Sequence, residues 1–206
     1  MDEEEIALIQ RAKEDTEAFG QLYERYSDRI YKYIFYRTSN QADAEDLTAR
    51  VFMRAMKHIP NFEYQGVPFS AWLYRIAHNL VANYHRDRNR RKIVALEDII
   101  PWYADDEGPE LAAELMEDKA HLLSAMRRLP ADRQELLFLK FVERLTNAEI
   151  GDIMGRTEGA IKSLYHRTLL SLREEMRRET AVANPNTNSE KEDPFWIRAW
   201  RRRRRR

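Results

Sequence analysis

The chain has 206 residues, of which 43% are hydrophobic, and it carries 35 basic and 35 acidic side chains but no cysteine. This length suffices for one or two domains with sizeable cores, and the lack of cysteine excludes a disulfide framework, a thiolate metal site and a cysteine nucleophile. Six basic residues are the terminal arginines 201–206, so the other 29 are outnumbered by acidic ones. Any contact with nucleic acid must therefore come from local patches.

The sequence also argues against a membrane protein and against an enzyme. No apolar run approaches the roughly 20 residues needed to cross a bilayer, and the acidic start MDEEE lacks the cationic segment of a signal peptide. We therefore expect a cytoplasmic protein. The five histidines are scattered without paired metal-ligand spacing, and there is no glycine-rich phosphate loop. We expect no catalytic residues, no metal, no other cofactor and no small-molecule substrate.

Three amphipathic helices are predicted in the first 60 residues. A short helix spans residues 3–12, and a longer one is capped by Thr16 and ends near residues 38–40. The third helix stops at Pro60. It begins with acidic side chains, which the positive end of the helix dipole favours: Asp43, Glu45 and Asp46.

A fourth amphipathic helix starts at Pro68 and carries apolar residues at three- and four-residue steps up to Tyr84, with Trp72 at the rim of the apolar face. Beside that face lies a cationic and amide-bearing strip, after which the helix runs into a basic cluster. Such a strip suits a phosphate backbone and base edges, although a solvated helix end is the simpler alternative. The strip consists of Arg75, Asn79 and Arg86, with His78 further round the helix.

The loop of residues 61–67 precedes this helix and holds two aromatic side chains, Phe62 and Tyr64, beside a glycine. Rings in a polar loop commonly cover a core, and we expect Trp72 of the following helix to lie in that core. Exposed rings can instead stack on unpaired bases. The sequence leaves both interpretations of the loop open.

The composition changes after Lys92, where acidic residues become frequent and prolines and a glycine interrupt any helix. We predict a first domain at residues 1–95, an acidic flexible linker at 96–110 and a second domain at 111–180. The second domain opens with a helix that ends at Leu129–Pro130. A further helix follows and carries Leu136, Leu137, Leu139 and Phe141.

Two closely spaced helices are predicted after residue 145. Thr146 and Glu149 form a capping box, Gly155 closes the first helix and Thr157 can cap the second. On the second helix, Ile161, Leu164, Tyr165, Thr168, Leu169 and Leu172 share one face. The opposite face suits a recognition helix in the major groove, although a hairpin of pure packing is an alternative. It consists of Gly159, Ala160, Ser163, His166 and Arg167, with Lys162 at the boundary.

The polar residues 180–193 are predicted to be disordered, so that residues 181–206 form a tail. The tail ends in PFWIRAWRRRRRR, whose tryptophans and arginines could dock on the body of the protein, on nucleic acid or on anionic lipid.

Together these stretches resemble bacterial RNA polymerase sigma factors of the extracytoplasmic-function (ECF) group of the sigma-70 family. DAEDLTARVFMRAMKHIPNF followed by FSAWLYRIAHNLVANYHRDRNRR resembles sigma region 2, and LPADRQELLFLKFVERLTNAEIGDIMGRTEGAIKSLYHR resembles region 4. The likeness covers about residues 19–176. Asn83 stands where the family usually has an aspartate, and Leu164 stands where an arginine is frequent.

The resemblance implies an all-α protein with two small helical domains, a region 2 bundle and a region 4 helix-turn-helix, joined by an acidic flexible linker. It implies a transcription initiation factor that binds core RNA polymerase and promoter DNA, and that an anti-sigma factor can hold inactive. The implied polymerase-binding residues are Asp43, Glu45, Asp46, Leu47, Val51 and Phe52. Those for the minus-ten element are Asn61, Phe62, Tyr64, Arg75, His78, Asn79 and Arg86, and those for the minus-thirty-five element are Thr157, Glu158, Gly159, Ala160, Lys162, Ser163, His166 and Arg167.

A one-component transcriptional regulator with the same helix-turn-helix is the alternative. Its first domain would bind an effector or mediate dimerisation, and the dimer would bind a palindrome without any other protein. A sigma factor would instead bind a promoter weakly without core polymerase. Contact of the arginine-rich tail with a membrane would be an addition to either function.

Overall fold

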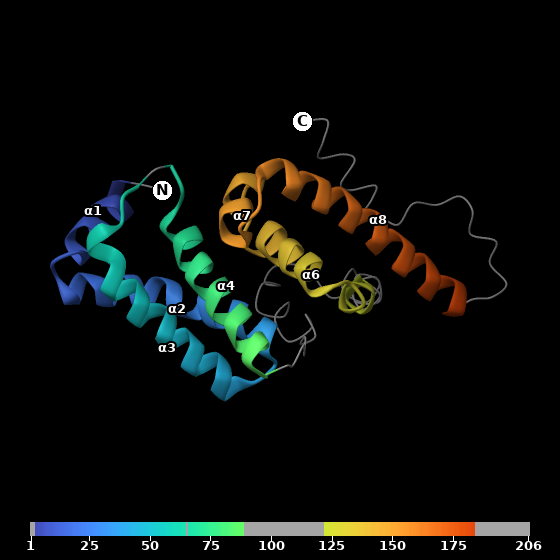
Figure 1. The fold of residues 1–206 in the computed structure, drawn as a ribbon, viewed down its shortest axis with the longest axis horizontal. Coiled ribbons are helices and arrows are strands. Elements are labelled where there is room, and N and C mark those ends of the chain that lie inside the picture. Colours follow the sequence, from blue (N-terminus) through green and yellow to red (C-terminus); the bar gives the residue numbers. More distant parts are fainter. Residues whose placement is uncertain (1–2, 65, 89–121, 184–206) are drawn as a thin grey trace, which may run out of the picture.

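The computed structural model describes residues 3–64, 66–88 and 122–183 (Figure 1). Every regular element in these ranges is a helix, which confirms the predicted all-α class. The first domain contains α1 (Glu3–Ala12), α2 (Thr16–Thr38), α3 (Gln41–His58), the 3₁₀ turn η1 (Ile59–Asn61) and α4 (Phe69–Arg88). The second contains a helical segment at residues 122–127, α6 (Ala131–Leu137), the π-helical turn η4 (Phe138–Val142), α7 (Asn147–Met154) and α8 (Glu158–Ala183). The predicted acidic linker and most of the tail lie outside the described residues.

The first domain is a bundle in which α2 packs against α1, α3 and α4, and α3 packs against α4. The predicted bounds of α1 and the predicted end of α2 are confirmed. The predicted cap of α2 is wrong, because the Asp15 carboxylate, not Thr16, accepts the hydrogen bond from the Glu17 amide at 2.8 Å. A carboxylate carries a negative charge that interacts favourably with the positive end of the helix dipole, whereas an uncharged hydroxyl does not.

The second domain is built on the predicted helix-turn-helix. The capping box is confirmed, with the Glu149 carboxylate accepting from the Thr146 amide at 2.6 Å and the Thr146 hydroxyl accepting from the Glu149 amide at 3.3 Å. Gly155 ends α7 at a φ of 63°, a conformation that favours glycine. Gly151 is required for a different reason, since a Cβ there would lie 2.6 Å from the Arg156 carbonyl oxygen across the turn.

The last helix is longer than expected. α8 continues to Ala183, so the prediction of disorder is wrong for residues 180–183. Those residues, Thr-Ala-Val-Ala, can all continue a helix, and the first strong breaker is the Asn184–Pro185 pair. None of the described helices is both long and apolar enough to span a lipid bilayer.

The two domains share one hydrophobic core. Helix α4 packs against α7, the first helix of the helix-turn-helix (Figure 1). Phe138 of η4 contacts the rings of Tyr33 and Tyr36 of α2, with centroids 5.7 and 5.3 Å apart. The buried apolar side chains of both domains therefore form a continuous cluster. Phe141, which the sequence pattern groups with the apolar residues of this helix, is instead 55% exposed.

Candidate nucleic-acid interface and the seam between the domains

The outer face of α8 is open to solvent along its first three turns. The predicted inward residues Ile161, Leu164 and Thr168 are buried, and the Thr168 hydroxyl donates to the Leu164 carbonyl at 2.8 Å. Lys162 forms an ion pair of 2.7 Å with Glu158 on the surface. All the residues predicted to contact the minus-thirty-five element are exposed: Thr157, Glu158, Gly159, Ala160, Lys162, Ser163, His166 and Arg167.

The strip on α4 is only partly open. Arg75, Asn79 and Arg86 are exposed, and the Arg86 guanidinium donates to the Asn83 side-chain oxygen at 2.8 Å. His78 lies apart from them, since only 21% of its side chain is exposed and its Nδ1 lies 2.7 Å from Oε1 of Glu135 in the second domain. The four residues predicted to share one function therefore lie in two different environments.

The aromatic pair of the loop is also divided. Phe62 is buried against Phe69 and Trp72, with ring centroids 5.3 and 5.1 Å away. For this ring, the interpretation that the loop covers the core is therefore the correct one. Trp72 is partly buried and packed on that core, as expected. Tyr64 is 45% exposed, and Asn61 is exposed as well. Of the two rings, Tyr64 is the one that a base could reach in this conformation.

The surface of α3 differs from the predicted polymerase-binding set. Glu45 and Asp46 are exposed, and Asp43 accepts a hydrogen bond of 2.7 Å from the Tyr84 hydroxyl. The apolar members of that set do not lie on the surface, because they belong to the buried face of the amphipathic helix. They are Leu47, Val51 and Phe52, all in the core.

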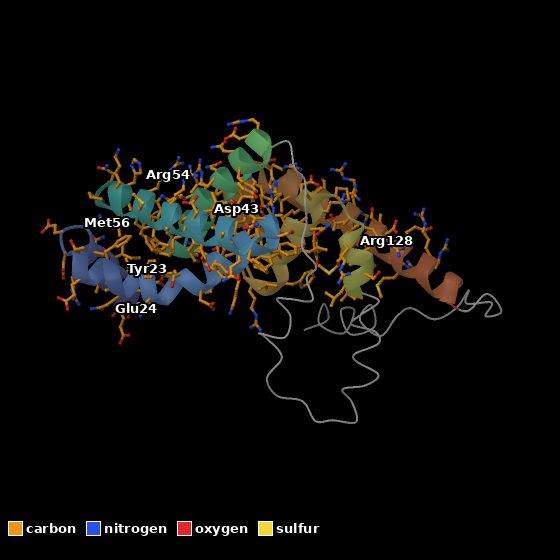
Figure 2. All side chains as sticks on the ribbon, turned by 90° about the horizontal axis from the view of Figure 1, so that it is seen from below. Tyr23, Glu24, Asp43, Arg54, Met56 and Arg128 are labelled. Carbon is orange, nitrogen blue, oxygen red and sulfur yellow. The ribbon has the colours of Figure 1, made fainter. Side chains whose placement is uncertain are left out.

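Two methionines that the sequence analysis missed lie on the outer face of α3. Met53 is 71% exposed and Met56 is 46% exposed, and Tyr23 of α2 is also exposed. Tyr23 and Met56 lie at the end of the first domain that is remote from the second domain (Figure 2). The signal that could have revealed them is a pair of methionines three residues apart outside the apolar stripe.

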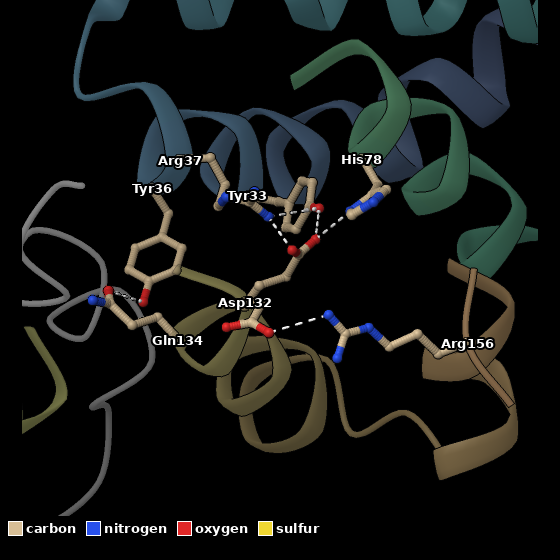
Figure 3. A network of polar contacts seen from close by, with 8 residues as sticks. Tyr33, Tyr36, Arg37, His78, Asp132, Gln134 and Arg156 are labelled. Atoms are coloured by element: carbon tan, nitrogen blue, oxygen red, sulfur yellow. Dashed lines mark hydrogen bonds and ion pairs between the residues drawn. The ribbon is translucent and has the colours of Figure 1, made fainter. Parts of the chain in front are cut away.

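A buried carboxylate, that of Glu135 in α6, lies where the two domains meet. Only 2% of its side chain is exposed. It accepts a hydrogen bond from the Tyr33 hydroxyl, forms an ion pair with Arg37 and contacts His78 (Figure 3). Tyr33 and Arg37 come from α2 and His78 comes from α4, so one residue of the second domain joins two helices of the first.

Several effects set the charge of Glu135. Burial raises the pKa of its carboxyl. The positive charge of Arg37 and the hydrogen bonds with His78 and Tyr33 lower that pKa by more than burial raises it, so that it is about 2. Burial and the neighbouring carboxylate raise the pKa of the Tyr33 phenol well above its usual value. At neutral pH the seam therefore contains an ionised Glu135 that accepts from a protonated tyrosine.

Further polar contacts flank this carboxylate. The Tyr36 hydroxyl donates to the Gln134 side-chain oxygen at 3.0 Å, and Arg29 of α2 pairs with Glu143 at 2.5 Å. A cavity of about 360 Å³ opens beside Glu135, with Arg37 and His78 in its lining.

Sequence reasoning missed the polar residues of the seam. A glutamate on a helix is normally on the surface, and nothing local distinguishes Glu135 from such a residue. The one available signal was the run of apolar residues at 136–139, since a helix that is apolar on all sides must be buried and its polar residues must then find partners.

Two family models match the chain, sigma-70 region 2 over residues 22–91 and sigma-70 region 4 over residues 120–172. Among curated relatives, the ECF RNA polymerase sigma factor BldN of Streptomyces coelicolor is 41% identical over 168 residues, which cover 81% of this chain and 64% of BldN. The ECF RNA polymerase sigma factor SigW of Bacillus subtilis is 31% identical over 182 residues, which cover 82% of this chain and 95% of SigW. The chain thus spans slightly less than two thirds of BldN and nearly all of SigW.

A solved structure has the same fold. In the co-crystal structure of the sigma factor RpoE with the anti-sigma factor NepR from Bartonella quintana, the matched chain is 21% identical, with a TM-score of 0.56. The match covers 77% of this chain and 96% of the other. The chain belongs to the sigma-70 family of RNA polymerase sigma factors, as its sequence predicted. Within that family it belongs to the ECF group, like BldN and SigW.

Proposed function

We propose that the chain is a transcription initiation factor that binds core RNA polymerase, directs it to particular promoters and helps to separate the strands at the minus-ten element. The observation that carries this proposal is the presence, in one chain of this family, of two separate surfaces suited to DNA. One is the open face of α8, and the other is the cationic and amide-bearing strip of α4 with the adjacent loop.

The start of α8 is proposed to read the minus-thirty-five element. Small residues, Gly159 and Ala160, stand at its amino end and would let the backbone approach the floor of the major groove. Beyond them, Lys162 and Arg167 can donate to phosphates or to guanine, and His166 can hydrogen-bond a base edge. Leu164 is buried, so the arginine that the family resemblance leads us to expect at this position has no counterpart on the open face.

The exposed ring of Tyr64 is proposed to hold one unpaired base of the minus-ten element. Stacking a base on an aromatic side chain yields about 1–3 kcal/mol, whereas separating each base step costs about 1.4 kcal/mol. One ring offsets about one or two steps, because Phe62 is engaged with Phe69 and Trp72. The rest of the melting energy must come from polymerase, and we propose that this chain has no catalytic activity of its own.

The outer face of α3 is proposed to bind core polymerase, through Glu45 and Asp46 at one end and Met53 and Met56 at the other. Exposed methionines adapt to a partner surface, and burying both would remove apolar area from water. Replacing Met53 and Met56 by aspartate should weaken core binding roughly tenfold, about 1.4 kcal/mol, in an equilibrium titration. Thermal stability should stay unchanged, and undiminished core binding would exclude this surface.

The remaining assignments follow from the same function. We propose that residues 1–95 bind polymerase and the minus-ten element, that 111–180 bind the minus-thirty-five element, and that 96–110 link them. The chain would act in the cytoplasm, where a bacterial sigma factor meets its polymerase. The RpoE structure contains an anti-sigma factor, and we propose that this chain has such a partner too.

Capture of genomic DNA fragments tests the proposal. Tagged chain, core polymerase, and both together are each incubated with the same fragment library, and the retained DNA is sequenced. The proposal predicts a discrete set of fragments retained only when chain and core are both present. Retention of palindromic fragments by the chain alone would identify a one-component regulator instead.

A further inference from the structure

The closed arrangement of the two domains brings the predicted DNA-reading helices close together. Helix α4 packs on α7, and α7 packs on α8. Because the axes of packed helices lie 8–10 Å apart, the start of α8 lies within roughly 20 Å of α4. The two DNA surfaces of this chain are therefore neighbours.

The two promoter elements are not neighbours. Elements centred at minus ten and minus thirty-five are about 25 base pairs apart, which at about 3.4 Å per base pair is roughly 85 Å of duplex. This separation is several times the distance between α4 and the start of α8. If the chain has the function proposed above, the domains must separate before both elements can be contacted.

His78 shows the same conflict at one side chain. It was predicted to face the minus-ten element, but its ring contacts Glu135 at 2.7 Å in the seam. Its Nδ1 is engaged by that carboxylate, and the ring, with 21% of the side chain exposed, lies largely in the seam and not on the open strip of α4.

We propose that Glu135 is an interdomain latch that holds the free chain closed. Its carboxylate is satisfied by three groups of the first domain, Tyr33, Arg37 and His78, so the seam keeps a buried charge without leaving it unpaired. The surface at Tyr23 of α2 and Met56 of α3 is remote from the seam (Figure 2). Polymerase can therefore engage the closed chain there, and the latch opens during assembly.

Distance measurements on the free chain test the latch. The chain has no cysteine, so Asp28→Cys in α2 and Arg177→Cys in α8 give two unique sites for spin labels, both on exposed side chains. The distance distribution is recorded by double electron–electron resonance in the wild-type background and with Glu135→Gln. A matched control is Glu175→Gln, since Glu175 pairs only with arginines of its own domain in the described part of the chain, Arg128 and Arg178.

The latch predicts one short distance for the wild-type background and for the control. Glu135→Gln should add a broad, longer component and raise the open-to-closed ratio at least tenfold, with unchanged helix content in circular dichroism. An unchanged distribution in Glu135→Gln, or an open wild-type chain, would overturn the proposal. If Glu135→Gln does not fold, the test uses the wild-type background alone. Adding core polymerase must then lengthen the distance between the two spin labels, and an unaltered distance refutes the latch.

Association kinetics distinguish a latch from a residue that only stabilises the fold. With Glu135→Gln, the initial association with core polymerase should keep its rate, because the surface that engages polymerase is open in the closed chain. The later step in which the distance between the domains lengthens should become several-fold faster, whereas a residue that only stabilises the fold would not change the rate of that step. The distance measurement on the free chain involves no polymerase. The latch proposal can therefore be refuted while the chain still directs transcription. A chain that opens as predicted but directs no transcription would instead refute the proposed function.

Discussion

Helices α4 and α8 carry the same kinds of side chain, but the fold uses them differently. His166 and Arg167 of α8 face solvent, and nothing in the described part of the chain covers that face. His78 of α4 is held by Glu135, while Arg75 of the same helix stays exposed. His78 and His166 therefore differ because the second domain lies against α4 at His78, whereas no described element covers the outer face of α8 at His166.

The largest expected effect concerns the open helix. Replacing Lys162, Ser163, His166 and Arg167 together by alanine should lower transcription from a target promoter roughly 100-fold or more, because each good base contact is worth about 1–3 kcal/mol. The control is Arg177→Ala with Arg178→Ala, two exposed arginines further along α8, which should change the yield less than about twofold. Undiminished promoter binding by the holoenzyme with the fourfold variant would remove α8 as the reading helix.

The next effect separates the two rings of the loop beside α4. Phe62→Ala should lower the free energy of unfolding by about 3 kcal/mol, since a buried ring is lost from contact with Phe69 and Trp72. Tyr64→Ala should change stability by less than about 0.5 kcal/mol but reduce promoter opening roughly tenfold. Urea denaturation measures the free energy of unfolding, and permanganate reactivity of unpaired thymines measures promoter opening. Equal stability losses would show that both rings serve the core.

Acid should weaken the seam that makes α4 different from α8. The pKa of Glu135 is about 2 in the closed chain against an ordinary value of 4.5 when the domains separate. A depressed pKa stabilises the closed form above pH 4.5, and this stabilisation, on the order of 3 kcal/mol, is lost as the pH falls from 4.5 towards 2.

Energy transfer between dyes attached to the two cysteines introduced by Asp28→Cys and Arg177→Cys would be followed from about pH 6 to about pH 3, a range that covers most of this loss. The closed-to-open ratio should fall at least tenfold, and Glu135→Gln should abolish this step. Helix content is monitored at each pH so that only folded protein is compared. A ratio that stays constant, or one that changes equally in Glu135→Gln, would place the acid response elsewhere.

The smallest effect compares two glycines within the helix-turn-helix. Gly151→Ala should destabilise the second domain by about 1–3 kcal/mol, because its Cβ would meet the Arg156 carbonyl oxygen at 2.6 Å. Gly159→Ala, with nothing within 4 Å, should instead stabilise α8 by up to about 1 kcal/mol. Thermal unfolding of both variants gives the sign, and a stabilised Gly151→Ala would contradict the close packing of this turn.

Local signals explain what could be predicted from the sequence. The capping box of α7, Gly155 and the apolar spacing of α8 each act within a few residues, so they predicted the helix-turn-helix and the open face of α8 correctly. The same spacing also placed Leu47, Val51 and Phe52 on the buried side of α3. Assigning them to a docking surface came from family resemblance alone, and the periodicity contradicted it.

What the sequence could not provide depends on the other domain. Glu135 and Arg37 are separated by almost a hundred residues, and neither shows locally that it is buried. Whether His78 faces DNA or the Glu135 carboxylate of α6 follows from the packing of the second domain on α4, which no periodicity encodes. Phe62 and Tyr64 likewise lie in the same loop, and only the packing of Phe62 on Phe69 and Trp72 distinguishes the buried ring from the exposed one.

Run-off transcription from a library of genomic fragments tests the central claim most directly. Purified core polymerase would be used with and without the chain, and the transcript starts would be sequenced. We predict discrete new starts that depend on the chain and share two upstream elements about 25 base pairs apart. No new starts, together with tight and specific DNA binding by the chain alone, would contradict the assignment and identify a one-component regulator.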